Sequence, residues 1–305
     1  MAPIRSVKDA KTYALRATSR YQTEEEVHKT LSSYRSHLAS ADTEDQRSLW
    51  TKQIAQLEEW LASDAFRNKA YPQGLDDLIL DLADWRSMIH AFQNVELQHE
   101  LFTSSHFFLQ WQSGAAYAIA CIIGKLTSRD QRDNSLVNVW ERVLPFIIQD
   151  YACTPEEAEA VTRKLHRTDG HFTNLNSKAI LLRNKMIAHN ESSPRIEWID
   201  LDHDIEILAR VWALVVGFCS FGLLFPFSRP DSAFNGLSSV TSQVELTSLQ
   251  KQRADFLDTF KMWTRKNFAT AALDLRSRAF AEISVTIDIH RANSHPDTKA
   301  DTSRA

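Results

Sequence analysis

The segment LLRNKMIAHN, residues 181–190, closes a predicted helix and is the point from which the fold can be worked out. We expect Asn174–Ala188 to be helical and the ESSP run at residues 191–194 to end that helix. A strongly apolar helix follows and extends to about Leu224, with Asp202 or Asp204 as its expected N-cap. The segment therefore precedes, across a short loop, a helix suited to a protein core.

Capping signals mark three further helix starts. Thr23 with Glu26 and Thr43 with Gln46 fit the capping box, in which the threonine accepts a backbone N–H and the second side chain reaches back. Proline directly after Thr154 starts the third helix, because the first helical position has no intrahelical partner for an N–H. These signals agree with the spacing of the apolar residues.

Apolar residues recur at helical spacing along most of the chain. The expected order is a helical hairpin before the YPQG turn at residues 71–74, a long helical stretch over Leu75–Leu126 with a break near residues 103–105, a loop over residues 127–135, and helices over Leu136–Ile148 and from Pro155 to about Gly170. After Pro226 we expect a linker to about Ser239, a helix over Val244–Phe280, a short strand over Ile283–Ile289, and a polar tail.

The composition sets limits on partners and compartment. The 305 residues carry a formal net charge of −4, so nucleic acid would need a local basic patch or a groove completed by a second chain. The three cysteines have neither pairing nor metal-ligand spacing, which suits a reducing compartment. Residues 1–11 are charged and lack the apolar core of a secretory signal, so we expect a cytoplasmic protein.

Residues Val211–Phe225 are almost entirely apolar and leave two interpretations open. The segment is about fifteen residues long, whereas a spanning helix needs roughly 20, and Arg210 and Pro226 bound it closely. These features favour a buried core helix and no membrane partner. The alternative is a membrane-attached effector.

The RNKMIAH string at residues 183–189 resembles the motif of the HEPN superfamily, in which an arginine and a polar residue precede a histidine by a few positions. The surroundings are similar too, since a long helix ends near Lys125 before the motif and one apolar helix follows it. This order resembles the HEPN proteins of abortive-infection systems. The resemblance implies a HEPN-type helical bundle in residues 71–228 of an all-α protein. The N-terminal helical hairpin (1–70), the C-terminal helical extension (229–290) and the disordered tail (291–305) lie outside the resemblance and are expected from the sequence pattern.

The resemblance implies a metal-independent endoribonuclease without cofactors, acting in phage defence (antiviral abortive infection) or as the toxin of a toxin–antitoxin pair. Attack of an RNA 2′-hydroxyl needs a base for its proton and an acid for the leaving 5′-oxygen, and His189 suits either role. The planar guanidinium of Arg183 suits a phosphate, and Asn184 would orient the histidine or hold an oxygen. The alternative is a HEPN-like module that only binds RNA or protein.

Helical geometry separates the two main residues. Six positions on an ideal helix turn about 600°, so Arg183 and His189 lie about 120° apart around its axis. The helix must end near His189, or a second chain must complete the site. HEPN relatives form two-fold dimers around a shared cleft, so the resemblance implies a homodimer, with an antitoxin or other regulatory protein as a further partner.

Other charged residues give weaker signals. A loose basic cluster near the motif offers a path for an RNA backbone, and ordinary solvated faces explain it equally well. Its members are Arg163, Lys164, Arg167, Lys178 and Lys185. His99 and His106 lie about two turns apart, roughly 10 Å, too far to share one metal ion without other ligands, so no metal site is expected. Without the resemblance, Arg183 reads as a solvated residue with an acidic neighbour and His189 as a helix C-terminal residue.

Overall fold

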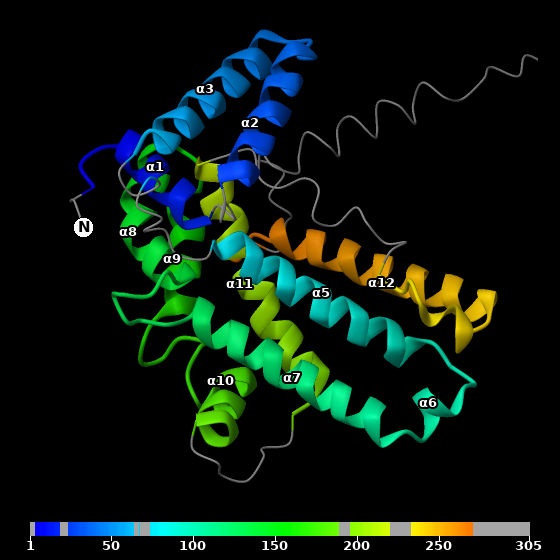
Figure 1. Cartoon of the computed structure of the whole chain (residues 1–305). Helices are drawn as coiled ribbons and strands as arrows, with labels where there is room; N and C mark the ends of the chain where they lie inside the picture. The colour runs from blue at the N-terminus through cyan, green and yellow to red at the C-terminus, as the bar shows by residue number, and fades with distance from the viewer. Residues whose placement is uncertain are drawn as a thin grey trace, which may run out of the picture.

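The computed structural model describes residues 4–18, 24–63, 67, 74–188, 196–219 and 233–270. Every regular element in these ranges is helical, as Figure 1 shows, which confirms the expected all-α class for this part of the chain. The helices are α1 (Val7–Thr18), α2 (Glu24–Ala39), α3 (Glu44–Leu61), α5 (Leu75–Asn94), α6 (Glu100–Thr103), α7 (His106–Leu126), α8 (Leu136–Gln149), α9 (Pro155–Leu165), α10 (Lys178–Leu182), α11 (Trp198–Cys219) and α12 (Gln243–Thr264). Two short turns, η1 (Arg183–Ala188) and η2 (Leu237–Ser239), complete the set.

Helix α11 is the centre of the bundle. It contacts α1, α5, α7, α8, α9, α10 and α12, and every residue from Ile207 to Val216 is buried. An almost continuous apolar surface explains this position, because a helix that is apolar all round must be covered on every side. The apolar segment Val211–Phe225 is thus a buried core helix as far as Cys219, and residues 220–225 lie outside the described ranges.

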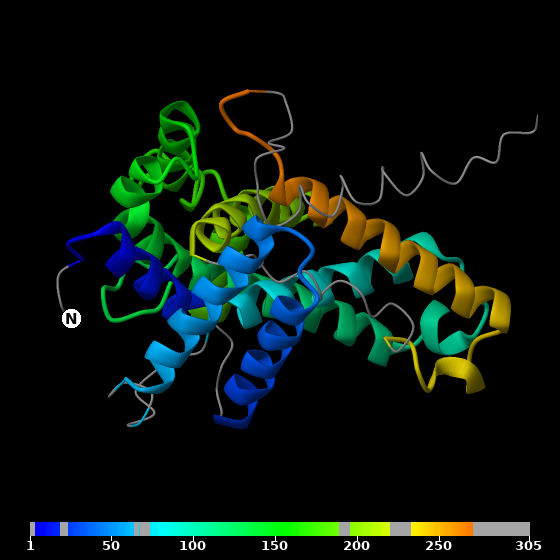
Figure 2. The same ribbon diagram turned by 90° about the horizontal axis from the view of Figure 1, so that it is seen from above.

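The two helices of the expected hairpin, α2 and α3, form a separate small core. Helices α2 and α3 pack against each other around Val27, Leu31 and Leu57. Both views show the pair projecting from the bundle (Figures 1 and 2). At the start of α3 the Thr43 side chain accepts the Gln46 N–H while the Gln46 amide oxygen accepts the Thr43 N–H, so this predicted capping box is confirmed.

Two other predicted helix starts have different outcomes. The Thr154 side chain accepts the Glu157 N–H at 3.3 Å, and α9 begins with Pro155, as expected. The Thr23–Glu26 capping box cannot be compared, because Thr23 and the side chain of Glu26 lie outside the described residues.

Helix α12 lies along α5 and also contacts α11 (Figures 1 and 2). Its Leu257 and Phe260 belong to the main core, while Leu249 packs with Phe234 and Leu97 in a second cluster at the far end of α5. The segment expected as a C-terminal extension therefore shares its core with the bundle.

The long helical stretch before Leu126 is more interrupted than expected. A break near residues 103–105 is present, but the chain also leaves the helix over Val95–His99. Leu97 is buried in the cluster at the end of α5, and the Gln98 N–H donates to Glu245 on α12. These contacts come from distant parts of the sequence, so local spacing could not reveal them.

The predicted helix over Val244–Phe280 is too long at its C-terminal end. Helix α12 begins after the capping box of Ser242 and Glu245 and ends at Thr264. Asn267 then accepts the N–H groups of Ala269 and Thr270, which fixes a turn where the helix was expected to continue. The predicted strand over 283–289 and the tail over 291–305 lie outside the described residues.

Helix α7 is long and apolar enough to cross a membrane by length and composition. It packs against α5, α10 and η1 in the bundle, although only 28% of its most apolar stretch of 18 residues is buried. One such helix is weak evidence for a membrane protein, because a core helix of a soluble protein passes the same test.

Candidate functional site

The motif begins on a π-helical turn that follows directly from the short helix α10. Helix α10 starts at Lys178, where the Ser177 side chain accepts the Ile180 N–H, so the expected helix over Asn174–Ala188 begins four residues late. From Arg183 to Ala188 the backbone forms a π-helical turn, a rare geometry that occurs frequently at functional sites. The separation of 120° assumed an ideal α-helix and does not apply to this turn. His189 lies outside the described residues, so its distance from Arg183 is not defined.

Arg183 lies against helix α7 with its side chain exposed to solvent. A Cβ atom added at Gly124 would stand 2.9 Å from Arg183 Cδ and 3.0 Å from its Nε. The Nη1 group of Arg183 donates to the Asn184 side-chain oxygen at 3.1 Å. Within the described ranges no carboxylate forms an ion pair with Arg183, so the acidic neighbour of the alternative interpretation is not found there.

Asn184 links the motif to the preceding loop. Its side-chain nitrogen donates to the side-chain oxygen of Asn174 at 2.8 Å, while its oxygen accepts from Arg183. Asn184 therefore holds the guanidinium and is itself held by Asn174. The sequence had offered the histidine or a substrate oxygen as partners of Asn184, and the arginine was overlooked.

The structure separates the predicted basic cluster. Arg163 forms an exposed ion pair with Glu159 at 2.9 Å, and the Lys164 ammonium lies 4.8 Å from the centre of the Phe268 ring. Arg167 is exposed in the turn after α9. Lys178 and Lys185 are exposed on α10 and η1, beside Arg183. Only these last two share the local surface of the motif.

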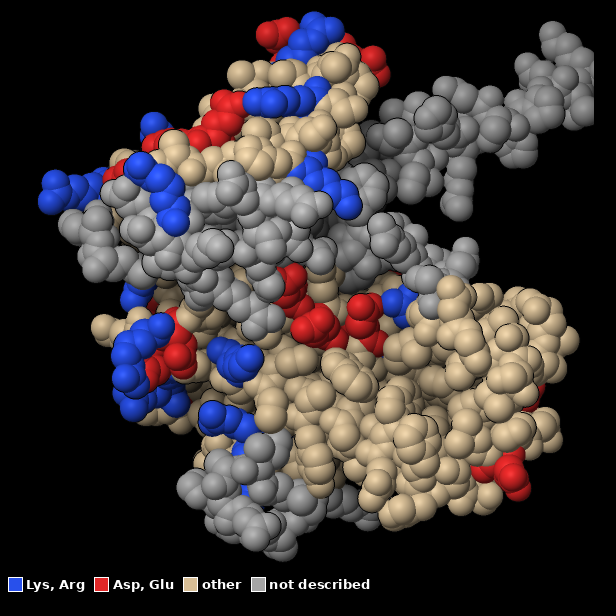
Figure 3. All heavy atoms as spheres, in the orientation of Figure 1, with Lys and Arg blue, Asp and Glu red and all other residues tan. Residues whose placement is uncertain are grey.

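The charged side chains are unevenly spread over the molecular surface. In Figure 3 Lys and Arg side chains gather on the side of α8, α9 and α10 and also over α2 and α3. The surface over α6 and the outer half of α7 is mostly uncharged, with a few acidic side chains at its edge. Helix α7 carries no Lys, Arg, Asp or Glu before Lys125. Phe107 and Leu109 of this helix are 66% and 59% exposed.

The sequence analysis missed a buried carboxylate, that of Asp204, which lies at the start of helix α10. Asp204, expected as an N-cap, lies within α11 and is fully buried. Its Oδ2 accepts from Ser177 Oγ at 2.7 Å and from the Ala179 N–H at 3.4 Å, and its Oδ1 lies 2.5 Å from His171 Nε2. With Asp204 ionised, Nε2 of His171 is the donor of this hydrogen bond, because an ionised carboxylate only accepts. Asp204 thus fixes both the start of α10 and the direction of an imidazole.

Asp202, the other expected N-cap, has a different role. It accepts two hydrogen bonds from Arg86 on α5, from Nε at 2.6 Å and from Nη2 at 2.8 Å. The first helical residue of α11 is Trp198, so both aspartates lie beyond its first turn. The prediction that either one caps the helix is wrong, because each carboxylate faces a cation or an imidazole on another element.

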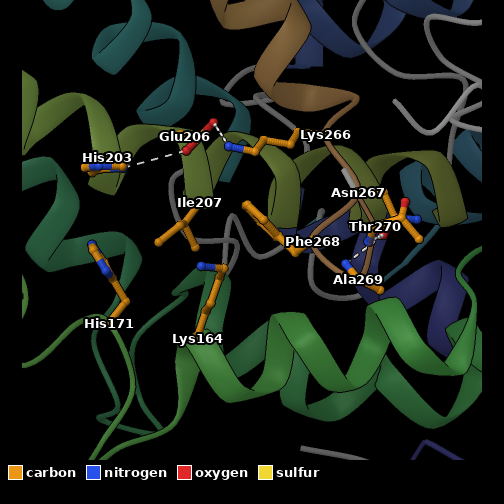
Figure 4. Close-up of a pocket in the computed structure, with 10 residues that line it drawn as sticks. All are labelled: Lys164, His171, His203, Glu206, Ile207, Lys266, Asn267, Phe268, Ala269 and Thr270. Carbon is orange, nitrogen blue, oxygen red and sulfur yellow. Dashed lines mark hydrogen bonds and ion pairs between the residues drawn. The ribbon is translucent and has the colours of Figure 1, made fainter. Parts of the chain in front are cut away.

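His171 lines a pocket of about 560 Å³ (Figure 4). The walls come from α9, the loop after it, α11 and the segment that follows α12. The lining residues are Lys164, His171, His203, Glu206, Ile207, Lys266, Asn267, Phe268, Ala269 and Thr270. No local motif marks His171 in the sequence, since its buried partner lies 33 positions away.

Comparisons of the chain with protein-family models, with curated proteins and with solved structures find no match. Among the described side chains, no group of three His, Cys, Asp or Glu residues is arranged to hold a metal ion. The motif site consists of the Arg183–Asn184 pair on its π-helical turn, and the His171–Asp204 pair lies at the start of α10, where Asp204 accepts from Ala179.

Proposed function

We propose that this chain is a metal-independent endoribonuclease of the HEPN type. The observation that carries the proposal is the state of Arg183 in the RNKMIAH string. Its guanidinium is exposed, forms no ion pair with a described carboxylate, and is held in place by Gly124 and Asn184. A cation fixed in this way can bind a phosphate without first breaking an ion pair with a described carboxylate.

The proposed reaction uses His189 for proton transfer, and Arg183 and Asn184 to stabilise the developing charge. The RNA 2′-oxygen attacks the adjacent phosphorus and loses its proton to a base, the bond from phosphorus to the 5′-oxygen breaks, and an acid protonates the leaving oxygen. The products are a 2′,3′-cyclic phosphate and a 5′-hydroxyl. His189 serves as acid or base, Arg183 stabilises the charge on the phosphorus oxygens, and Asn184 positions Arg183.

The proposal includes a homodimer in which two motifs face one cleft. Helix α7 supports this part, because it contacts α10 and η1 and presents Phe107 and Leu109 to solvent on an uncharged face. A second copy covering this face would bury apolar surface. We place the enzyme in the cytoplasm, in phage defence or as a toxin neutralised by an antitoxin.

Cleavage of labelled RNA in the presence of a chelator tests the enzymatic proposal. Wild-type protein should generate 2′,3′-cyclic phosphate ends, and Arg183→Ala and His189→Ala should lower the rate by a factor of about 100 or more. Arg35→Ala is the matched control, because Arg35 is an exposed arginine that pairs with Glu58 between α2 and α3, the helices of the separate small core. Toxicity on expression is compared in parallel, since a latent toxin needs its trigger to cut RNA.

Two results would reject the ribonuclease. Equal cleavage by wild type and both motif variants would show contamination. Neither cleavage nor toxicity, together with RNA binding that depends on Arg183, would favour a binding module that uses the same surface without chemistry.

A further inference from the structure

The pocket lined by His171 is built from segments that are distant in sequence. Lys164 comes from the last turn of α9, His171 from the following loop, Glu206 and Ile207 from α11, and Lys266 from the segment after α12 (Figure 4). Its volume of about 560 Å³ falls within the range of about 300–1,000 Å³ that is usual for small-molecule sites. Neither Arg183 nor Asn184 lines it.

A tight turn brings the first two of these residues together. A Cβ at Gly170 would stand 2.3 Å from the His166 carbonyl oxygen and 2.8 Å from that of Lys164, so only glycine fits there. The next residue, His171, donates its backbone N–H to the Lys164 carbonyl at 2.7 Å. The chain thus folds back on the end of α9, and the two side chains point into the same space in Figure 4.

The buried carboxylate of Asp204 fixes the orientation of the His171 imidazole. Its Nε2 donates to Asp204, whose carboxylate is fully buried and also accepts from Ser177 and Ala179. Because Nε2 is occupied, Nδ1 is the ring atom left for another partner. That atom accepts a hydrogen bond when the ring is neutral and donates one when the ring is protonated, so it pairs with a hydroxyl or an oxyanion.

The cations of the pocket are not balanced by its carboxylate. Lys266 pairs with Glu206 at 2.6 Å, and His203 lies 3.8 Å from the same carboxylate group. Lys164 is half-buried and contacts the Phe268 ring, and none of the described carboxylates pairs with it. Among the residues that the structure describes, the Lys164 ammonium therefore lines the pocket without a counter-ion. It lies beside the His171 imidazole and an apolar wall of Ile207 and Phe268.

We propose that this pocket binds the phosphate monoester end of a nucleotide-sized ligand, separately from the Arg183 site. The phosphate oxygens accept from the Lys164 ammonium and from a remaining hydrogen of Lys266, and pair with Nδ1 of His171. The space is too large for an inorganic anion alone, and Ile207 accommodates the uncharged part of the ligand. A free mononucleotide and a 5′-phosphorylated RNA end share this chemistry.

Calorimetric titration of the full chain with adenosine 5′-monophosphate, adenosine and inorganic phosphate tests the proposal. Adenosine 5′-monophosphate should bind at least about tenfold more tightly than adenosine or inorganic phosphate, since only it supplies both the phosphate and the uncharged nucleoside. Equal affinity for adenosine, or no heat with the monophosphate up to millimolar concentration, would overturn the proposal.

Matched substitutions locate the binding. Lys164→Gln and His171→Asn should each weaken binding of the monophosphate by about tenfold or more. Arg163→Gln and His166→Asn are the controls, since both side chains are exposed, paired with Glu159 and Asp169 respectively, and absent from the pocket lining. Equal losses in the controls would reject the assignment. Lys164→Gln removes no buried partner, so its thermal unfolding should match the wild type and its binding result remains interpretable.

The source of the phosphate and the independence of the site need two further comparisons. A hexanucleotide with a 5′-phosphate that binds more tightly than its 5′-hydroxyl form would indicate RNA ends, whereas binding of the mononucleotide alone would indicate a metabolite. Arg183→Ala should bind the monophosphate as wild type does. This result separates the two proposals, because binding in the pocket can be rejected without rejecting the nuclease, and the nuclease without rejecting the pocket.

Discussion

The side chain of Arg183 lies directly over the bare Cα of Gly124 on helix α7. The space between them is so small that a Cβ at position 124 would be 2.9 Å from Arg183 Cδ. The backbone of α7 thus serves as a surface on which the arginine rests, and Asn184 holds its far end at 3.1 Å. Position 124 therefore controls the direction of the guanidinium.

Gly124→Ala should displace Arg183 without unfolding the protein. The new methyl group forces the flexible arginine side chain to move, while alanine favours a helix over glycine by about 0.5–1 kcal/mol. We expect RNA cleavage to fall about tenfold and the melting temperature to stay equal or rise. Gly114→Ala on the same helix is the control, because a Cβ added at Gly114 would meet no atom within 4 Å. Equal cleavage by the two variants would show that the contact has no role in activity.

The ion pair of Arg210 and Glu157 lies fully inside the core, at 2.7 Å. Arg210→Met should lower the free energy of unfolding by about 3–5 kcal/mol, because it leaves Glu157 as a buried charge without its cation. Adding Glu157→Leu should restore much of this loss, as measured by urea denaturation. The exposed pair of Arg163 and Glu159 is the comparison, and Arg163→Ala should cost about 0.5 kcal/mol or less. A double variant no more stable than the single one would contradict this account.

Asp204→Asn should loosen the start of α10. The amide has one acceptor oxygen in place of two, so either His171 or Ser177 loses its partner, at a cost of about 2–4 kcal/mol. Amide hydrogen exchange should rise first over residues 171–182 and leave α5 and α12 nearly unchanged. Uniform acceleration across the bundle would mean that Asp204 supports the whole core instead of this loop.

His90 should make the protein less stable in acid. Burial lowers the pKa of His90 from 6.5, Arg86 lowers it further, and Asp202, Asp255 and the Gln252 hydrogen bond offset only part of this. The folded state therefore disfavours the protonated ring. The stability from a neutral His90 is complete above pH 6.5, declines as the unfolded chain takes up its proton, and is fully lost once the pH has fallen below the lowered pKa of the folded state.

The measurement is the free energy of unfolding at pH 7 and pH 5. His90→Gln should show a smaller loss over this range than the wild type, because glutamine does not titrate. The exposed His106 gives the control variant, His106→Gln, whose loss should equal that of the wild type. Identical losses in all three proteins would exclude His90 as a source of the pH dependence.

Phe107→Glu should dissociate the proposed dimer. The side chain is 66% exposed, so a carboxylate there costs the monomer little but places charge in an uncharged interface. Light scattering should show a change from dimer to monomer mass. Val244→Glu is the control, since Val244 is 76% exposed on α12, a helix that packs on α5 and α11. A wild-type protein that is already monomeric would remove the dimer from the proposal.

Several elements were predictable because their signals are local. The Thr43–Gln46 capping box, the Thr154–Pro155 start and the burial of α11 all follow from residues within a few positions of each other. Helix ends were predicted less well. Helix α5 stops at Asn94, where Leu97 turns into a cluster with Phe234, a residue that is distant in sequence.

The charged residues of the site were the hardest to place. Asp202 and Asp204 look like N-caps because they precede an apolar run, yet Arg86 and His171 are their partners. The sequence placed the basic residues near the motif in one loose cluster, but Lys164 lines a pocket that Arg183 does not reach as a lining residue. A charged side chain pairs with whichever group of opposite charge the fold brings near. Because that group can be distant in sequence, the neighbouring residues do not reveal it.

The sequence alone determined that this chain is helical, where several of its helices begin, that α11 is buried, and that an arginine and an asparagine lie together on a helical segment. Those properties depend on hydrogen bonds and apolar spacing within one or two turns. Only the tertiary structure decided that Arg183 rests on Gly124, that Asp204 holds His171, and that four segments enclose a pocket. These depend on how whole helices pack, because contacts between distant segments form only when the core closes around α11.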